Sequence, residues 1–354
     1  MHMADALLSP STATVMYAAS ATAAGLSVRQ LRKENDPKKL PVMAVSAAMI
    51  FAGQMINYTI PGTGSSGHLC GGMLLSALLG PQAGFLAMIA VLTIQCLFFA
   101  DGGLMALGAN IWNMAFYGCF VGYYLIWRPL QRSNLFQRRT SHAGQRACII
   151  LASVLGCVLT LQLGALSVTV ETLASGITEL PFAAFAGLML PIHLAIGLVE
   201  GLITSAVLLF IYEARPELLM DIGTSDDNHA KLSLRGVIAS LAVITALTGG
   251  VLSLYASGNP DGLEWALFGN AEAGYAENMG LDEENFGRQS AVSDTASAIQ
   301  ESTSFLPDYA FKDSDAAAGT SVSGLAGSAI VAGVCVLIGA AAGLMRKRAA
   351  QERA

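Results

Sequence analysis

Residues 191–213 read PIHLAIGLVEGLITSAVLLFIYE, and before the final residue of this run the acidic or basic side chains are His193 and Glu200 alone. A helix needs about 20 mostly apolar residues to cross the hydrocarbon core of a bilayer. The run therefore predicts a membrane-spanning helix. Comparable apolar stretches lie near 9–28, 41–60, 69–80, 82–100, 104–127, 147–168, 236–256 and 321–345. The stretch at 69–80 is the shortest of them. Together they predict about nine transmembrane helices.

The overall composition agrees with a membrane protein. Apolar residues make up 54% of the chain, charged residues 12%, and the mean hydropathy is +0.56. A soluble domain has about 25% charged residues. The six cysteines form no CxxC pair, so we expect buried thiols rather than disulfides or a zinc knuckle. The predicted fold class is an all-α integral membrane protein that contacts lipid, and no feature indicates a nucleic-acid partner.

The basic residues predict the orientation of the chain in the membrane. Most of the 19 lysines and arginines fall into four groups, at 29–39, 128–146, 215–235 and 346–353. Basic loops stay in the cytoplasm. All four groups lie on that side if nine spans cross, including 69–80. We therefore expect a multi-pass protein of the bacterial cytoplasmic membrane, with the N-terminus outside and the C-terminus in the cytoplasm.

The predicted spans form two domains. Residues 1–213 form a core of seven predicted helices, 214–235 a cytoplasmic linker, and 236–354 a domain of two predicted helices. The segment 257–320 between these last two helices is acidic, with Arg288 and Lys312 as its only bases. Its composition predicts an outside loop that is poorly ordered over much of its length.

The N-terminal dipeptide Met1-His2 is a candidate metal chelator. Nothing in front of the first apolar run resembles a cleavable leader, so we expect the mature chain to begin with Met1. The terminal amine, the amide nitrogen of His2 and its imidazole can then close adjacent chelate rings around one ion. Three nitrogens near one plane suit Ni(II) or Cu(II) better than zinc, calcium or magnesium. Taken alone, His2 is more simply interpreted as an ordinary terminal residue, and the rest of the sequence favours the chelator.

A glycine-rich loop at 61–72, PGTGSSGHLCGG, supplies a fourth nitrogen. Glycine allows the tight turns that bring a side chain close to another segment. The loop is not a phosphate loop, because a histidine, His68, stands where the lysine is required and no strand is predicted before it. His68 is predicted to complete a four-nitrogen site with Met1 and His2. Cys70 is a soft alternative ligand.

Polar residues within apolar segments are candidates for support of this site. We predict that Asp5 holds an imidazole N–H, as a partner behind the metal ligands. Asn57 and Asn110 are predicted to fix the loops beneath the site. The simpler interpretation of His193, Glu200 and Asn113 is hydrogen bonding between helices.

These strings together resemble the substrate-binding membrane component of nickel and cobalt energy-coupling-factor transporters. The matching pieces are Met1-His2, the loop that ends at His68, the segment from Asp101-Gly102-Gly103 to Asn113, and the segment from His193 to Thr204. The string at 260–264, PDGLE, resembles the small accessory component of these systems, fused here to the core. One departure is MADA at 3–6, where the family usually has a sequence of the type Ile-Pro-Asp-Gly.

The resemblance implies a function as well as a fold. It implies a seven-helix core into which the N-terminus folds, and Ni(II) or Co(II) as substrate, held by the terminal amine, by His2 through its amide and side chain, and by His68. It also implies a membrane scaffold partner and two cytoplasmic ATPase subunits, since this chain has no Walker motif. The expected protein is a transporter subunit rather than an enzyme, and planar nitrogen ligation slightly favours nickel.

Two other functions are compatible with an integral membrane protein of this kind. A membrane metalloenzyme would activate water on a bound metal, but the sequence has no HExxH pair. A passive channel or secondary transporter for another solute would not depend on His2.

Overall fold

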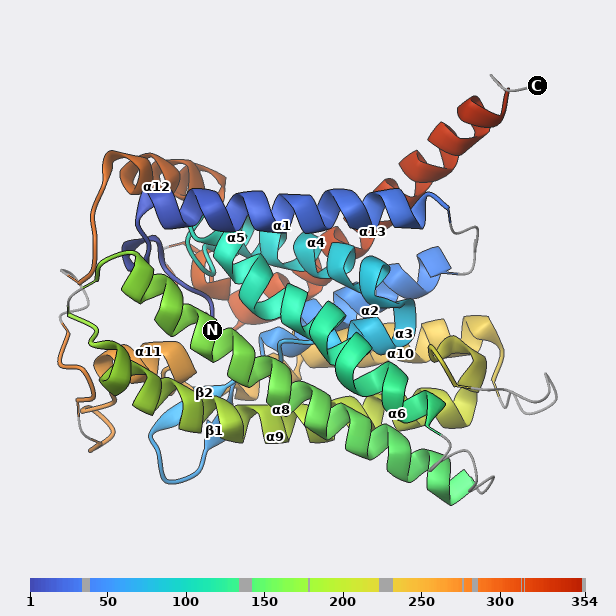
Figure 1. The fold of residues 1–354 in the computed structure, drawn as a ribbon, viewed down its shortest axis with the longest axis horizontal. Helices are drawn as coiled ribbons and strands as arrows, with labels where there is room; N and C mark the ends of the chain where they lie inside the picture. The colour runs from blue at the N-terminus through green and yellow to red at the C-terminus, as the bar shows by residue number, and fades with distance from the viewer. Residues whose placement is uncertain are drawn as a thin grey trace.

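The computed structural model describes residues 1–33, 39–133, 142–177, 179–222, 232–275, 277–281, 286–312, 314 and 316–351, with Lys39 and 341–351 described by their backbone. Of the basic residues that predict the orientation, Lys38, Arg138, Arg139, Lys231 and Arg353 lie outside these ranges. The described residues are predominantly helical, as the apolar runs predict. Figure 1 shows the long helices side by side along the longest dimension of the molecule.

The core domain contains most of the predicted spans as helices. They are α1 (Pro10–Leu31), α2 (Lys39–Gln54), α3 (Gly72–Leu79), α4 (Pro81–Phe99), α5 (Leu107–Asn110) continued by the π-helical η2 (Ile111–Trp127) and α6 (Arg128–Arg132), then α8 (His142–Ala174) and α9 (Phe182–Ala214). Short elements join them: η1 (Asp5–Leu7), the hairpin of β1 (Tyr58–Ile60) and β2 (Ser65–Gly67), and η3 (Pro216–Leu218).

The accessory domain contributes two more long helices. They are α10 (Leu234–Gly250) and α13 (Ala318–Gln351), and both pack against α2 of the core. Between them lie η5 (Leu252–Tyr255), α11 (Gly262–Phe268), α12 (Ala291–Thr303) and η6 (Pro307–Tyr309). A side chain on Gly249 or Gly324 would collide with the backbone of the other residue, so this pair of glycines permits α10 and α13 to cross closely.

Four helices of the described residues are long and apolar enough to cross a membrane: α4, α8, α9 and Ala318–Ala340 within α13. Large apolar side chains on their outer surfaces and on η2 are exposed, as a lipid-facing surface requires, including Leu125, Leu202 and Leu337 at 64%, 61% and 69%. The chain is thus a multi-pass membrane protein by length and composition of its helices. The number nine remains a prediction.

The span expected at 69–80 is not a full membrane-spanning helix. Residues 69–71 are not helical, and α3 has 8 residues, all of them buried. At about 1.5 Å per residue such a helix is roughly 12 Å long, against a hydrocarbon core of about 30 Å. The physical reason lies at both ends: Gly71 adopts φ +83° ahead of the helix, and Gly80 adopts φ +82° before Pro81 begins α4.

The expectation of poor order for 257–320 is wrong for its described parts. These parts include α11 and α12, which lie at the same end of the molecule as the N-terminus (Figure 1). The Gln300 amide donates to the carbonyl oxygens of Cys96 and Gly102, at 2.9 and 2.7 Å. The Tyr309 ring stacks on Phe99, with centroids 5.0 Å apart. The prediction from composition is wrong here because these residues are held by contacts with the core. A local sequence pattern does not reveal such contacts.

Candidate metal centre

The N-terminal peptide enters the bundle and is fixed there by its backbone. The Met3 N–H donates to Asn110 Oδ1 at 2.7 Å, and the Met3 carbonyl accepts from Asn110 Nδ2 at 3.2 Å and from the Gly103 N–H at 2.9 Å. Met1 and Met3 are 4% and 0% exposed. The Asn110 side-chain amide thus pairs with both backbone groups of Met3, as a neighbouring β-strand would. This pairing fixes the position of Met1 and His2 within the bundle.

The loop that carries His68 is fixed from beneath by α9. The Glu200 carboxylate accepts from the N–H groups of Cys70 and Gly71, both at 2.9 Å, and is itself 1% exposed. Gln54 of α2 donates to the Cys70 carbonyl at 2.9 Å. Glu200 therefore joins helix to loop, which agrees with its interpretation as an interhelical hydrogen-bonding residue and ties it to the position of His68.

The side chains of the two histidines predicted as ligands are in contact. The rings of His2 and His68 are stacked with centroids 5.2 Å apart and planes inclined by 19°. His68 Nδ1 lies 3.0 Å from the Leu69 carbonyl oxygen. Because a carbonyl only accepts, Nδ1 carries a hydrogen, and Nε2 is the nitrogen on the open side of the ring. His68 therefore presents the nitrogen that a metal ion can use.

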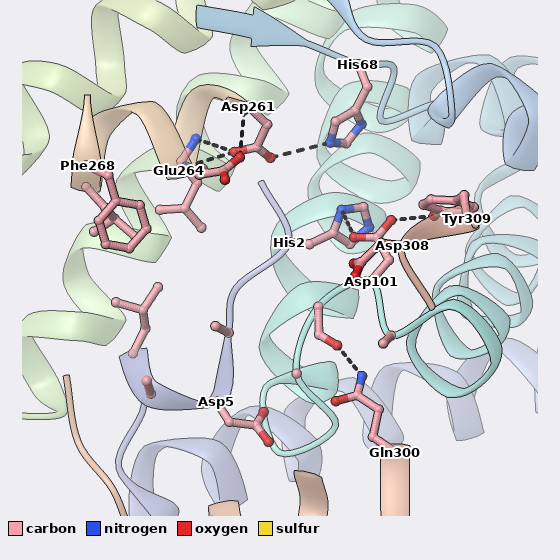
Figure 2. A pocket seen from close by; sticks show the side chains of 18 of the residues that line it. His2, Asp5, His68, Asp101, Asp261, Glu264, Phe268, Gln300, Asp308 and Tyr309 are labelled. Atoms are coloured by element: carbon pink, nitrogen blue, oxygen red, sulfur yellow. Dashed lines mark hydrogen bonds and ion pairs between the residues drawn. The ribbon is translucent and has the colours of Figure 1, made fainter. Parts of the chain in front are cut away.

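A carboxylate of the accessory domain faces both the terminal amine and His68. Asp261 Oδ2 lies 2.7 Å from the Met1 amine nitrogen and 3.7 Å from His68 Nε2 (Figure 2). Its Oδ1 accepts from the N–H groups of Leu263 and Glu264, at 2.8 Å each, in a capping box that begins α11. One carboxylate thus both starts the helix and reaches the N-terminus of the chain.

The second carboxylate at the site is Asp101. Its Oδ1 lies 3.1 Å from His2 Nδ1, and Oδ2 accepts from the Tyr309 hydroxyl at 2.5 Å. With the hydrogen on Nδ1, His2 Nε2 is a lone-pair nitrogen, and it has no hydrogen-bond partner among the described residues. Asp101 therefore holds the His2 ring in the metal-free site through Nδ1.

The charges of the site depend on burial and on these pairs. Burial lowers the pKa of His2 to about 4, although Asp101 opposes this, so the ring is neutral near pH 7. Burial alone would also lower the pKa of the Met1 amine, but the Asp261 carboxylate outweighs it and the pKa is raised. The amine in turn holds the pKa of Asp261 well below its ordinary value, against the effect of burial. The metal-free site is an ammonium–carboxylate pair beside two imidazoles.

The remaining predicted support residues lie nearby with different partners. Asp5 Oδ1 accepts from the Ala106 N–H at 2.9 Å, and Asp5 has no imidazole partner among its described contacts. Asn57 contributes its carbonyl, which accepts from the Ser257 N–H at 2.7 Å. Asn113 donates to Glu171 of α8 at 2.8 Å, an interhelical bond as expected. His193 differs, since its Nδ1 bonds to Met189 of its own helix.

A cavity of about 730 Å³ leads to the histidines. Figure 2 shows His2, His68 and Asp101 on its wall, together with Asp261, Glu264, Asp308 and Tyr309 of the accessory domain. In the described part of the chain, no three side chains of His, Cys, Asp or Glu are grouped so that they could hold a metal ion. The Met1 amine and the His2 amide are further nitrogens in the same peptide as the His2 ring.

Two known protein families match this chain, one over its core and one over its C-terminal part. Residues 2–218 match the family described as the cobalt uptake substrate-specific transmembrane region, and residues 235–343 match the PDGLE domain. The chain belongs to this cobalt uptake family. A chain of Archaeoglobus fulgidus named NikMN is 36% identical over 335 residues, which are 94% of this chain and 95% of that one.

Two further relatives and one solved structure agree with this membership. The fused nickel transport protein NikMN of Rhodobacter capsulatus is 31% identical over 79% of this chain and 80% of its own length. The cobalt transport protein CbiM of Sorangium cellulosum is 29% identical over 62% of this chain and 94% of its own. The crystal structure of a truncated transition metal transporter superposes with a TM-score of 0.50, at 32% identity, over 60% of this chain and 99% of that one. The relatives of this cobalt uptake family member are thus nickel and cobalt transport proteins.

Sequence reasoning missed Asp261 and Asp101 as neighbours of the histidines. Asp261 is recognisable from sequence as the N-cap of a helix, because Glu264 stands three residues later. Its contact with Met1 spans 260 positions of the chain and has no local signal.

Proposed function

We propose that this chain is the substrate-binding subunit of an ATP-driven energy-coupling-factor transporter, which captures Ni(II) or Co(II) at the outer face of the cytoplasmic membrane. The observation that carries the proposal is the convergence of the buried Met1 amine with the rings of His2 and His68, three groups that come from segments 66 residues apart in sequence.

The proposed ligands are four nitrogens. They are the Met1 amine, the His2 amide nitrogen, the His2 imidazole through Nδ1, and His68 Nε2. Loading requires His2 Nδ1 to leave Asp101 and to pass its hydrogen to Nε2. It also requires the Met1 amine and the His2 amide each to lose a proton, since metal ligands must present lone pairs. Four nitrogens near one plane match Ni(II) better than most divalent ions, so nickel is slightly favoured as the substrate.

Transport requires partners that this chain does not contain. In the proposal a membrane scaffold subunit and two cytoplasmic ATPases reorient the loaded subunit, with the N-terminus facing outside and the C-terminus inside. Release then needs the chelate to open, either by reprotonation of the amine and amide or by withdrawal of the terminal peptide.

The test is isothermal titration of the metal-free, untagged protein with Ni(II) and Co(II). We expect one-to-one binding that is lost when an alanine is inserted between Met1 and His2, because the insertion moves the amine out of the chelate ring. His68→Ala should also weaken binding. Equal binding by the insertion variant would refute the ligand set, and binding of neither ion by the natural sequence would refute the function.

A further inference from the structure

The carboxylate of Asp261 occupies the place between two proposed metal ligands. Its Oδ2 lies 2.7 Å from the Met1 amine and 3.7 Å from His68 Nε2. It comes from the accessory domain, 193 residues after His68 in the chain. Its other oxygen is engaged in the cap of α11, so Oδ2 is directed at the site by a rigid turn rather than by a free side chain.

These distances are compatible with three donors on a single ion. Nitrogen and oxygen ligands lie about 2.0–2.2 Å from a divalent ion such as zinc, which is similar in size to nickel and cobalt. Two donors on one such ion are therefore at most about 4.4 Å apart. Both measured separations fall within that limit. The side chain of Asp261 is 20% exposed, on the side of the cavity that leads to the histidines.

We propose that Asp261 stays in the site when the ion binds and supplies its fifth donor, a carboxylate oxygen. This inference rests on the proposed function and deepens it, because it makes the fused accessory domain a part of the metal site. An oxygen outside the nitrogen plane converts a square-planar site into a five-coordinate one. The accessory domain then influences which ion is held and how firmly.

Gly262 is consistent with the close approach that this role requires. A Cβ at this position would lie 2.9 Å from Ile196 Cδ1 and 3.0 Å from His193 Cε1. The Pro260 carbonyl accepts from the Ser66 N–H at 2.8 Å, and Trp265 Nε1 donates to the Thr63 carbonyl at 2.9 Å. The turn that bears Asp261 is thus attached directly to the hairpin that leads to His68.

The experiment compares Asp261→Asn with Glu272→Gln in the full chain. Asparagine is also a good N-cap residue, so α11 is retained. Glu272 is an exposed carboxylate of the same domain, and its replacement removes the same charge away from the site. Ni(II) is titrated into each protein by calorimetry, and the absorption and magnetic moment of the Ni(II) complex are measured. Melting of the metal-free proteins checks that both are folded.

We expect Asp261→Asn to bind Ni(II) about 10- to 100-fold more weakly than Glu272→Gln, the range found when a residue beside a metal site is lost. We also expect a change from a paramagnetic five-coordinate complex to a diamagnetic planar one. If Asp261 only competes with the ion for the amine, the variant binds more tightly, and the inference is overturned. Equal affinity with equal spectra overturns it too. In both cases the natural sequence still binds one ion, so the proposed function survives. Absence of binding by the natural sequence overturns both.

Discussion

Replacement of Glu200 by glutamine should weaken metal binding although this residue is not a proposed ligand. The carboxylate accepts two hydrogen bonds, from the N–H groups of Cys70 and Gly71, both at 2.9 Å, and it is 1% exposed. A glutamine has one acceptor oxygen and one NH2 group. One of the two backbone N–H groups therefore keeps a partner, while the other faces a donor and is left buried without one.

The expected magnitude follows from that count. A buried donor without a partner costs about 1–3 kcal/mol. If this cost falls on the conformation that presents His68, the affinity for Ni(II) decreases roughly 5- to 150-fold, since about 1.4 kcal/mol corresponds to a factor of ten. The absorption spectrum of the bound ion should stay nearly the same, because the ligands themselves are unchanged.

The assay is calorimetric titration of Glu200→Gln against Glu213→Gln, with melting curves of both. Glu213 is on the same helix but pairs with His142 and Arg146, at 3.1 and 3.4 Å, far from the histidines along α9. The reasoning would be refuted if the two variants bound Ni(II) with the same affinity, or if Glu200→Gln altered the ligand field while its affinity was unchanged.

Further predictions concern the N-terminal peptide and the accessory turn. Asn110→Ala leaves the Met3 N–H without its partner, so melting temperature and Ni(II) affinity should both fall, at a cost of about 1–3 kcal/mol; unchanged melting would contradict this. Gly262→Ala places a methyl group 3.0 Å from His193 Cε1 and should separate α11 from the core, which a disulfide cross-linking or spin-label distance across that contact would detect. The Ni(II) affinity should fall as the pH is lowered from about 8 to about 6, because the raised pKa of the Met1 amine keeps its proton in place over that range. Protonation of His2, whose pKa is about 4, should contribute little to this pH dependence above pH 5. Calorimetric titrations at several pH values should therefore show an affinity whose dependence on pH reflects proton release from the amine and the amide.

The sequence alone determined the class of the molecule and supplied the proposed metal ligands. Long apolar runs such as 191–213 lie in helices because a helix satisfies its backbone hydrogen bonds within its own segment, as lipid requires. The six cysteines are buried and unpaired, as their spacing predicted. Met1, His2 and His68 were predicted as ligands because their donor atoms are properties of residue type and of position at a chain end. These properties are local, so they can be read without a fold.

The tertiary structure decided which groups surround those nitrogens. Asp261 and Asp101 reach the site, and Asp5 turns to Ala106 instead, because hydrogen-bond partners depend on packing between distant segments. Packing also explains the short α3 and the helices α11 and α12, which lie in a segment expected to be poorly ordered. Contacts with other elements, rather than their own composition, set the length of the first and the formation of the other two. At the site such a contact joins Met1 and Asp261, 260 positions apart, and a linear pattern carries no signal of it.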